Sequence, residues 1–317
     1  MQAKIGKKKY ICKVTVLAAK KATATPVVSV TPSATPAAST TPSYAPKSSP
    51  AAPASNGGLS TAKPGNPDGP VYPIYPDDPV PTAPVPAKNE QDLDALKQLD
   101  QIDISANADL DTLDCNQNNL TSIDLSSNAS LKRIYCQENE ISALDVSNIT
   151  ELETLRCDSN QIKSLDVSNN TALTIFTCDN NQLDTLDVTQ NKKLETLSCA
   201  SNNIANIDVS ANTELLLLDV CYLPVTELDV SNNTHLTDLR ISETKLTQID
   251  LSKLSELYSI NCDNIPLTSL DVSHNEQLTY LSCHSNPQLT YLDLSNNPLL
   301  NKNNIQVGND VTITFAN

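Results

Sequence analysis

Hydrophobic and polar positions repeat along most of this chain with a period of 21 residues. In residues 152–172, LETLRCDSNQIKSLDVSNNTA, Cys157 is the second residue after Leu155, and Val167 is the second residue after Leu165. A period of two is typical of a strand with one buried side, so both pairs point inward and the residues between them point outward. Each 21-residue unit is therefore predicted to hold two short strands joined by turns.

The repeat is regular enough to predict a solenoid. Five cysteines occur 21 residues apart in the same frame, namely Cys115, Cys136, Cys157, Cys178 and Cys199. Self-similarity at a fixed period indicates coils that each stack only on their neighbours. About ten coils fit between residues 93 and 300. The predicted fold is a mostly β solenoid with two short parallel strands per coil.

The frame L-x-x-L-x-C-x-x-N-x-[LI] resembles the leucine-rich repeat, L-x-x-L-x-L-x-x-N-x-L, with Cys at the third Leu. The resemblance covers about two-thirds of the chain and extends to bacterial surface proteins with an internalin-like architecture. The D-[VL]-S signature stands where many eukaryotic members have a helix, which implies a flat, largely β solenoid. The resemblance also implies a protein-binding module at the bacterial cell surface or outside the cell.

Asparagines are expected to form the turns, because residues 90–317 contain a single glycine, Gly308. Asparagine tolerates strained turn geometry, and its side chain bonds nearby backbone groups. One asparagine per coil recurs three residues after the inward cysteine, at Asn118, Asn139, Asn160, Asn181 and Asn202. We expect these side chains to stack as a ladder that satisfies buried backbone donors and acceptors.

Composition divides the chain into three parts. Residues 1–19 contain AKIGKKKYICKVTV, which resembles the last strands of a group-2 bacterial Ig-like domain; a signal-peptide remnant is the alternative, and whether Met1 is the natural start stays open. Residues 20–88 are rich in Pro, Ser and Thr and are predicted to be a disordered linker. Residues 89–317 form the solenoid with terminal caps, a short helix over 89–99 and strands within 304–317.

Charge and hydropathy exclude some classes of function. Residues 90–317 hold 11 Lys and Arg against 34 Asp and Glu, a formal charge of −23. Such a domain repels phosphate backbones, so nucleic acid is excluded as a partner. No run of 18 apolar residues exists in the sequence, so no membrane-spanning helix is predicted.

The cysteines are predicted to be core residues. Seven occupy the inward position: Cys115, Cys136, Cys157, Cys178, Cys199, Cys262 and Cys283. Neighbouring strands lie about 4.8 Å apart, beyond the roughly 3.5–4.5 Å between Cβ atoms that a disulfide needs. No C-x-x-C pair suggests a metal site. Cys221 follows the inward Val220 and either faces outward or is tucked in by a local adjustment.

Two other patterns suggest chemistry, and both have a simpler interpretation. Ser282, His284 and Asp263 form a nominal triad, but residues two apart on a strand are about 7 Å apart, so no enzyme activity and no cofactor are predicted. An aspartate also recurs on the second segment of each coil, from Asp103 to Asp293. Calcium binding is one alternative for this row; hydrogen bonds to nearby backbone and serine groups are the expected role.

The outward positions of the first strand in each coil form the candidate binding face. Arg133, Tyr135, Arg156 and Ile175 fall on three successive coils, and Arg and Tyr are enriched at binding hot spots. Leu216 and Leu217 are expected to add exposed apolar surface. The predicted binding residues are Arg133, Tyr135, Arg156, Ile175, Leu217, Arg240, Tyr280 and Tyr291.

The resulting hypothesis is a cell-surface or secreted module that binds a protein, from the host or from a cell surface, through this face. A carbohydrate-binding module that uses Tyr258, Tyr280 and Tyr291 is the first alternative. A spacer module of a larger surface protein or enzyme is the second. The identity of the partner and the route of export and anchoring stay open.

Overall fold

The computed structural model describes residues 4–5, 8–9 and 99–315. Near the N-terminus, β1 (Lys4–Ile5) pairs antiparallel with β2 (Lys8–Lys9). The rest of the Ig-like resemblance in residues 1–19 and the linker over 20–88 lie outside the described residues. So does the predicted helix over 89–99, except for Leu99, which has no regular secondary structure.

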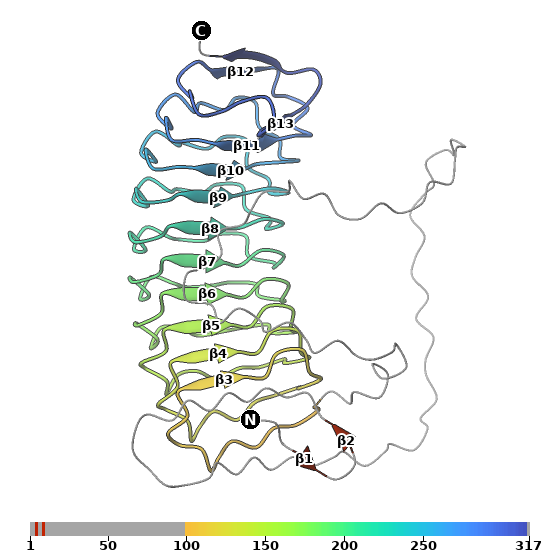
Figure 1. Ribbon diagram of the computed structural model, residues 1–317, viewed down its shortest axis with the longest axis vertical. Helices are drawn as coiled ribbons and strands as arrows, with labels where there is room; N and C mark the ends of the chain where they lie inside the picture. The colour runs from red at the N-terminus through yellow and green to blue at the C-terminus, as the bar shows by residue number, and fades with distance from the viewer. Residues whose placement is uncertain (1–3, 6–7, 10–98, 316–317) are drawn as a thin grey trace, which may run out of the picture. The chain divides into compact units, whose positions relative to one another are not determined.

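The described part of the solenoid is built around one parallel sheet whose strand order follows the chain (Figure 1). Its strands are β3 (Thr112–Asp114), β4 (Arg133–Tyr135), β5 (Thr154–Arg156), β6 (Ile175–Thr177), β7 (Thr196–Ser198), β8 (Leu217–Asp219), β9 (Asp238–Arg240), β10 (Ser259–Asn261), β11 (Tyr280–Cys283) and β13 (Ile305–Val307). Up to β11, each strand residue pairs with the residue 21 positions later, as Leu155 does with Phe176. The predicted leucine-rich-repeat solenoid of about ten coils is confirmed.

A second, two-stranded sheet lies near the C-terminus. There β12 (Tyr291–Leu294) pairs parallel with β14 (Thr312–Phe315). Strands are therefore present in the segment 304–317, where they were expected. Within residues 99–315 there is no helix, and the described residues contain no segment that could cross a membrane as a helix.

The prediction of two strands per coil is wrong for the coils that carry β3 to β10, where the second segment is not a strand. In that segment, the Asp166 Oδ1 accepts the backbone N–H of Ser168 at 2.9 Å. The same bond recurs along the aspartate row, for example from Ser231 to Asp229. The Ser295 N–H donates to Asp293 in the same way at the end of β12, so this bond ends the second segment whether or not the segment pairs as a strand.

The apolar positions of the repeat form the core, as the pattern predicted. Leu155, Cys157 and Val167 are fully buried, and Leu165 is 8% exposed. Each buried apolar side chain of this size contributes roughly 1.5–3 kcal/mol relative to an exposed one. Because a coil is flat, its inward side chains are covered only when the coils above and below are in place.

The seven inward cysteines form a buried row of free thiols. Burial raises the pKa of the Cys157 thiol well above its ordinary value, and the same holds for Cys136, Cys178 and Cys199. These thiols are therefore neutral at physiological pH and act as small hydrophobic side chains. Cys221 is half-buried, which fits its predicted place outside the inward row.

The asparagine ladder forms as predicted. The Asn160 Oδ1 accepts the backbone N–H of Ile141 on the preceding coil at 3.0 Å. Its Nδ2 donates to the carbonyls of Cys136 and Cys157, both at 3.0 Å. Asn139, Asn181, Asn202 and Asn286 accept and donate in the same way at their own coils. Asn118 accepts the Leu99 N–H and donates to the Cys115 carbonyl of its own coil. Each amide thus ties two coils together inside the core.

The strained turn position is not the ladder asparagine, which corrects that expectation. A left-handed backbone occurs once per coil, at the residue just before the ladder position. These residues are Gln117, Glu138, Ser159, Asn180, Ser201, Tyr222, Glu243, Asn264 and Ser285, with φ between 51° and 61°. The ladder asparagines are therefore retained for their hydrogen bonds, and their neighbours accept the strain.

Candidate binding surface

The front face is defined here as the outward side chains of β3 to β11, together with the side chain two positions after each of β3 to β10. These side chains stand in columns because the strands pair without a shift in register. The backbone beneath them is held by the parallel ladder and the buried core. The face can therefore vary in chemistry while its geometry stays fixed.

The predicted cluster at the N-terminal end of this face is assembled. Arg133, Tyr135, Arg156 and Ile175 lie on the adjacent strands β4, β5 and β6, and all four are half-buried. The Arg133 Nη2 donates to Asp111 Oδ1 at 2.8 Å, and its Nε donates to Thr112 Oγ1 at 3.1 Å. The Arg156 guanidinium carbon lies 6.0 Å from the centre of the Tyr135 ring. The cluster is held in place before any partner arrives.

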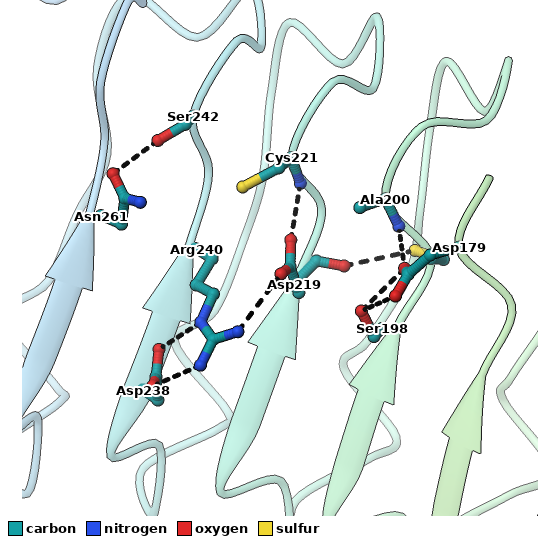
Figure 2. Close-up of polar contacts among 10 residues, drawn as sticks. Asp179, Ser198, Ala200, Asp219, Cys221, Asp238, Arg240, Ser242 and Asn261 are labelled. Carbon is teal, nitrogen blue, oxygen red and sulfur yellow. Dashed lines mark hydrogen bonds and ion pairs between the residues drawn. The ribbon is translucent and has the colours of Figure 1, made fainter. Parts of the chain in front are cut away.

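Small side chains and carboxylates occupy the centre of the face. Figure 2 shows Asp179 facing Ser198, whose Oγ donates to both carboxylate oxygens at 2.7 Å, and the Ala200 N–H, which donates at 2.6 Å. On the preceding coil, Asp158 Oδ2 accepts from Thr177 Oγ1 at 2.6 Å. Hydroxyl and amide donors therefore hold two neighbouring carboxylates on adjacent coils.

The proton affinity of Asp179 is unusual. Burial, followed by the nearby Asp158 carboxylate, raises its pKa to about 7, against the lowering effect of the Ser198 hydrogen bond. Burial also raises the pKa of Asp219, two coils further along. Desolvation and like charge both disfavour the ionised form, so Asp179 at the centre of the front face exchanges a proton near neutral pH.

Arg240 is bound by two aspartates of its own sheet (Figure 2). Its Nε and Nη2 donate to the two oxygens of Asp238 at 3.1 and 3.0 Å. Its Nη1 lies 3.7 Å from Asp219 Oδ2. A bidentate pair of this kind fixes the plane of the guanidinium. The predicted binding residue Arg240 is thus on the front face, with its charge already partly compensated.

The prediction of exposed apolar surface at Leu217 is wrong. Leu217 is 5% exposed, because it is the first residue of β8 and lies between Thr196 of β7 and Asp238 of β9. Leu216, which precedes the strand, is 42% exposed. The exposed leucine is therefore at the edge of the front face.

The three tyrosines considered for carbohydrate binding do not share one location. Tyr258 is 57% exposed and lies beside the half-buried Tyr280, whose N–H donates to the Tyr258 carbonyl at 3.2 Å. Tyr291 is in β12, outside the front sheet, where it lines a shallow groove with Asp271 and Asp293 of the aspartate row. Its hydroxyl is 3.2 Å from Thr314 Oγ1.

The nominal triad lacks a bond between serine and histidine. The Ser282 Oγ donates to both oxygens of Asp263, at 2.7 and 2.9 Å. The backbone N–H of His284 also donates to Asp263, at 2.6 Å, and the His284 ring contacts Ser285 instead. Asp263 therefore anchors the end of β11, and the Ser282 hydroxyl is bonded to Asp263 and not to the His284 ring.

The aspartate row on the second segment has the structural role that was expected. The hydroxyl of Ser168, and then its backbone amide, lower the pKa of Asp166 by hydrogen bonding to its carboxylate. Asp103, Asp124, Asp145, Asp187, Asp208, Asp229, Asp250, Asp271 and Asp293 have lowered pKa values for the same reason. In the part of the chain that the structure describes, no group of three His, Cys, Asp or Glu could hold a metal ion.

Comparisons with known proteins agree with this geometry at the level of the fold. No protein-family model matches the sequence, and no curated protein matches it. Among solved structures, the functional domain of InlJ from Listeria monocytogenes, described as including a cysteine ladder, is similar with a TM-score of 0.58 and 30% identity. That similarity covers 70% of this chain and 56% of InlJ, so the chain spans little more than half of that structure.

Two further structures share the fold at lower identity. An internalin C2 from Listeria monocytogenes has a TM-score of 0.53 and 20% identity, over 56% of this chain and 83% of that one. The ectodomain of the plant receptor kinase GASSHO1/SCHENGEN3 from Arabidopsis thaliana, in complex with CASPARIAN STRIP INTEGRITY FACTOR 2, has a TM-score of 0.55 and 18% identity, over 66% of this chain and 31% of that one. The chain is a leucine-rich-repeat solenoid, and its structural neighbours include internalins.

Proposed function

We propose that this chain is an extracellular or cell-surface module that binds a partner protein through its front face and carries out no catalysis. The observation that carries the proposal is the cluster of Arg133, Tyr135, Arg156 and Ile175 on three adjacent strands. Arg and Tyr are over-represented among residues that dominate binding energy. Their side chains are held by Asp111, Thr112 and one another, so little conformational entropy is lost on binding.

The proposed location rests on the likeness to InlJ. The proposed recognition role also rests on the hydrogen bonds among the polar side chains of the front face. The similarity to the InlJ domain includes a cysteine ladder, which this chain also has. The polar groups of the front face are bonded to one another and not arranged around a reacting position, as Asp263 and Ser282 illustrate. Both features support a recognition role for the solenoid.

The test is retention of surface proteins by the full-length chain. The chain and its Arg133→Ala/Tyr135→Ala/Arg156→Ala variant are immobilised and exposed to epithelial cell-surface and mucus extracts, with and without enzymatic removal of glycans. An Asp124→Asn/Asp145→Asn variant in the aspartate row is the matched control. We expect a protein that the wild type and the control retain, and that the folded triple variant loses, irrespective of glycan removal.

Other results would count against the proposal. Equal retention by the wild type and the triple variant would place the binding residues elsewhere. Retention that disappears when glycans are removed would support the carbohydrate alternative, for which the adjacent Tyr258 and Tyr280 are the candidate residues. No retained protein at all would leave the spacer role as the better account.

A further inference from the structure

The exposed apolar side chains of the solenoid are unevenly placed. In the described residues, the large apolar side chains that are exposed are Leu216, Tyr222, Tyr258, Tyr291 and Leu299. Leu216 and Tyr258 occupy the same repeat position, since 42 residues, or two coils, separate them. They come just before β8 and β10, at the edge of the front face. No counterpart in the preceding coils is apolar, because that position holds Lys132, Glu153, Thr174 and Glu195.

Threonines fill the gaps in this column. Thr237 lies between Leu216 and Tyr258, and Thr279 follows Tyr258. The Thr237 Oγ1 donates to the Leu216 carbonyl at 3.1 Å, and the Thr279 Oγ1 donates to the Tyr258 carbonyl at 3.3 Å. Since both hydroxyls are bonded to the backbone, each threonine adds its methyl group to the column. We name Leu216, Thr237, Tyr258 and Thr279 the edge strip.

Three exposed glutamates lie beside the edge strip, and one of them, Glu256, also has its Oε2 at 3.4 Å from His235 Nδ1. Glu195 precedes it on the neighbouring coil, where its carbonyl accepts the Leu216 N–H at 2.8 Å. Glu214 and Glu256 lie two residues before Leu216 and Tyr258, and both are exposed. Over residues 214–279 the sequence holds 11 Asp and Glu against 3 Lys and Arg. One of those three is Arg240, which Asp238 and Asp219 already bind.

We infer that the edge strip is a docking site for an extended segment of a partner protein that carries apolar side chains flanked by Lys or Arg. The inference builds on the protein-binding role proposed above and specifies the chemistry of the partner. Exposed leucine and tyrosine supply the apolar contact, and a charge-complementary rim selects basic flanks and raises the association rate. Binding removes the exposed apolar side chains of both proteins from water.

The spacing of the strip sets the spacing in the ligand. Two coils at about 4.8 Å place Leu216 and Tyr258 about 10 Å apart along the solenoid. An extended chain in the polyproline II conformation advances about 3.1 Å per residue with three residues per turn, so two apolar side chains three residues apart lie on one face, about 9 Å apart, and match the strip. A lysine or arginine beside either of them reaches the carboxylates of Glu214 or Glu256. The expected ligand pattern is therefore an apolar pair at i and i+3 with basic neighbours.

The test uses a phage-displayed library of random twelve-residue peptides, selected on the full-length chain. The best peptide is then synthesised, and its Kd is measured by fluorescence anisotropy. We expect enriched peptides with an apolar pair three residues apart and adjacent Lys or Arg. The Kd should rise at least tenfold for Leu216→Ser/Tyr258→Ser, and less than twofold for the matched pair Tyr291→Ser/Leu299→Ser, which removes equally exposed apolar side chains. If the double variant does not fold, the single variant Tyr258→Ser replaces it, and its Kd should rise at least threefold.

The charge component has its own arm. We expect Glu195→Gln/Glu214→Gln/Glu256→Gln to raise the Kd about tenfold and to flatten its dependence on salt, while Glu138→Gln/Glu140→Gln/Glu227→Gln changes it less than twofold. Enrichment of acidic or purely polar peptides, no enrichment, or equal Kd values for the two serine pairs would overturn the inference. The Arg133→Ala/Tyr135→Ala/Arg156→Ala variant should bind the peptide as the wild type does, because its edge strip is intact. This result tests the edge strip separately from the cluster proposed for the front face.

Discussion

Tyr222 shows how the repeat imposes a backbone on whatever residue stands at a given position. Its φ of 58° lies in the left-handed region, and its side chain is 60% exposed. Eight other coils place a polar residue with an unbranched Cβ at this position. A bulky side chain in this conformation costs about 1 kcal/mol or more, and its exposure means that little packing offsets that cost.

Replacing Tyr222 should therefore stabilise the fold. We expect Tyr222→Asn to raise the unfolding free energy by about 0.5–1 kcal/mol, because asparagine tolerates the left-handed region. A change of that size raises the Tm of a domain this long by about 1–4 °C. Thermal unfolding followed by circular dichroism measures it, with Tyr291→Asn as the control. A Tm that falls for Tyr222→Asn would show that the ring makes a stabilising contact.

Asp179 gives a prediction with a defined sign. The unfolded chain loses this proton near the ordinary pKa of 3.8, whereas the folded chain loses it at about 7. Between these values the folded state binds more protons, so the contribution of Asp179 to stability falls as the pH rises from about 4 to about 7. We expect Asp179→Asn to raise the urea midpoint at pH 8 and to raise it less, or not at all, at pH 4.

Asp166 is the control of opposite sign for that experiment. Hydrogen bonds from Ser168 lower its pKa in the folded state, so its contribution is present above the unfolded value of 3.8 and is lost as the pH falls below it. Asp166→Asn should lower the urea midpoint at pH 8 and have a smaller effect at pH 3. If both variants lower the urea midpoint at pH 8, the assignment for Asp179 is incorrect.

Cys157 tests the buried thiol row. Its side chain is fully buried, and its Sγ lies 3.5 Å from the Thr177 carbonyl. A serine hydroxyl costs about 1–3 kcal/mol to bury without an equally good partner, and its shorter bond leaves part of the site empty. Cys157→Ser should lower the Tm, while Cys221→Ser at the half-buried position should lower it less. Normal stability of Cys157→Ser in thermal unfolding would refute the role of the row in the core.

At the scale of the coil, the asparagine ladder connects neighbouring coils beside the parallel sheet. Asn160 accepts one bond and donates to three carbonyls on two coils, those of Cys136, Cys157 and Asp158. Removing its amide leaves several buried backbone groups unpaired, at about 1–3 kcal/mol for each group that water cannot reach. Some coils have another residue in place of the ladder asparagine. Thr244 is one example, and its Oγ1 donates to the Ile241 carbonyl of the same coil at 2.8 Å.

Asn160→Ala should consequently destabilise the fold by at least about 3 kcal/mol. Thr244→Ala, which removes a single bond at the equivalent position, should cost only about 1 kcal/mol. Urea denaturation of the two variants gives the comparison directly. A loss for Asn160→Ala no larger than that for Thr244→Ala would mean that water replaces the ladder bonds.

Sequence reasoning succeeded where the repeat decides the outcome and failed where single contacts do. The inward positions of Leu155 and Cys157, the ladder of Asn160 and the solenoid itself all follow from the 21-residue frame. The missing second strand could not be predicted because Leu165, Asp166 and Val167 alternate in the same way as Leu292, Asp293 and Leu294 of β12, and yet form no strand. The left-handed backbone position was not predicted, because the residues at this position share a conformation but not a residue type.

The candidate site was predicted in part. Arg133, Tyr135, Arg156 and Ile175 are brought together because adjacent coils place equivalent residues side by side. Leu217 was misjudged because a position on a strand is covered by its two neighbours, whereas Leu216 just outside it is not. The signal for the edge strip was present in the sequence as apolar residues 42 positions apart, but its exposure required the structure.

At the scale of the whole molecule, we propose that a protein partner covers the front face. Hydroxyl-radical footprinting of the full-length chain, alone and with the surface protein retained in the pull-down, tests this directly by oxidation of tyrosine side chains. Tyr135 and Tyr280 report on the front face, and Tyr291 in β12 is the internal control. We expect the partner to protect Tyr135 and Tyr280 while Tyr291 is oxidised as before. Protection of Tyr291 with unchanged oxidation of Tyr135 and Tyr280 would contradict it.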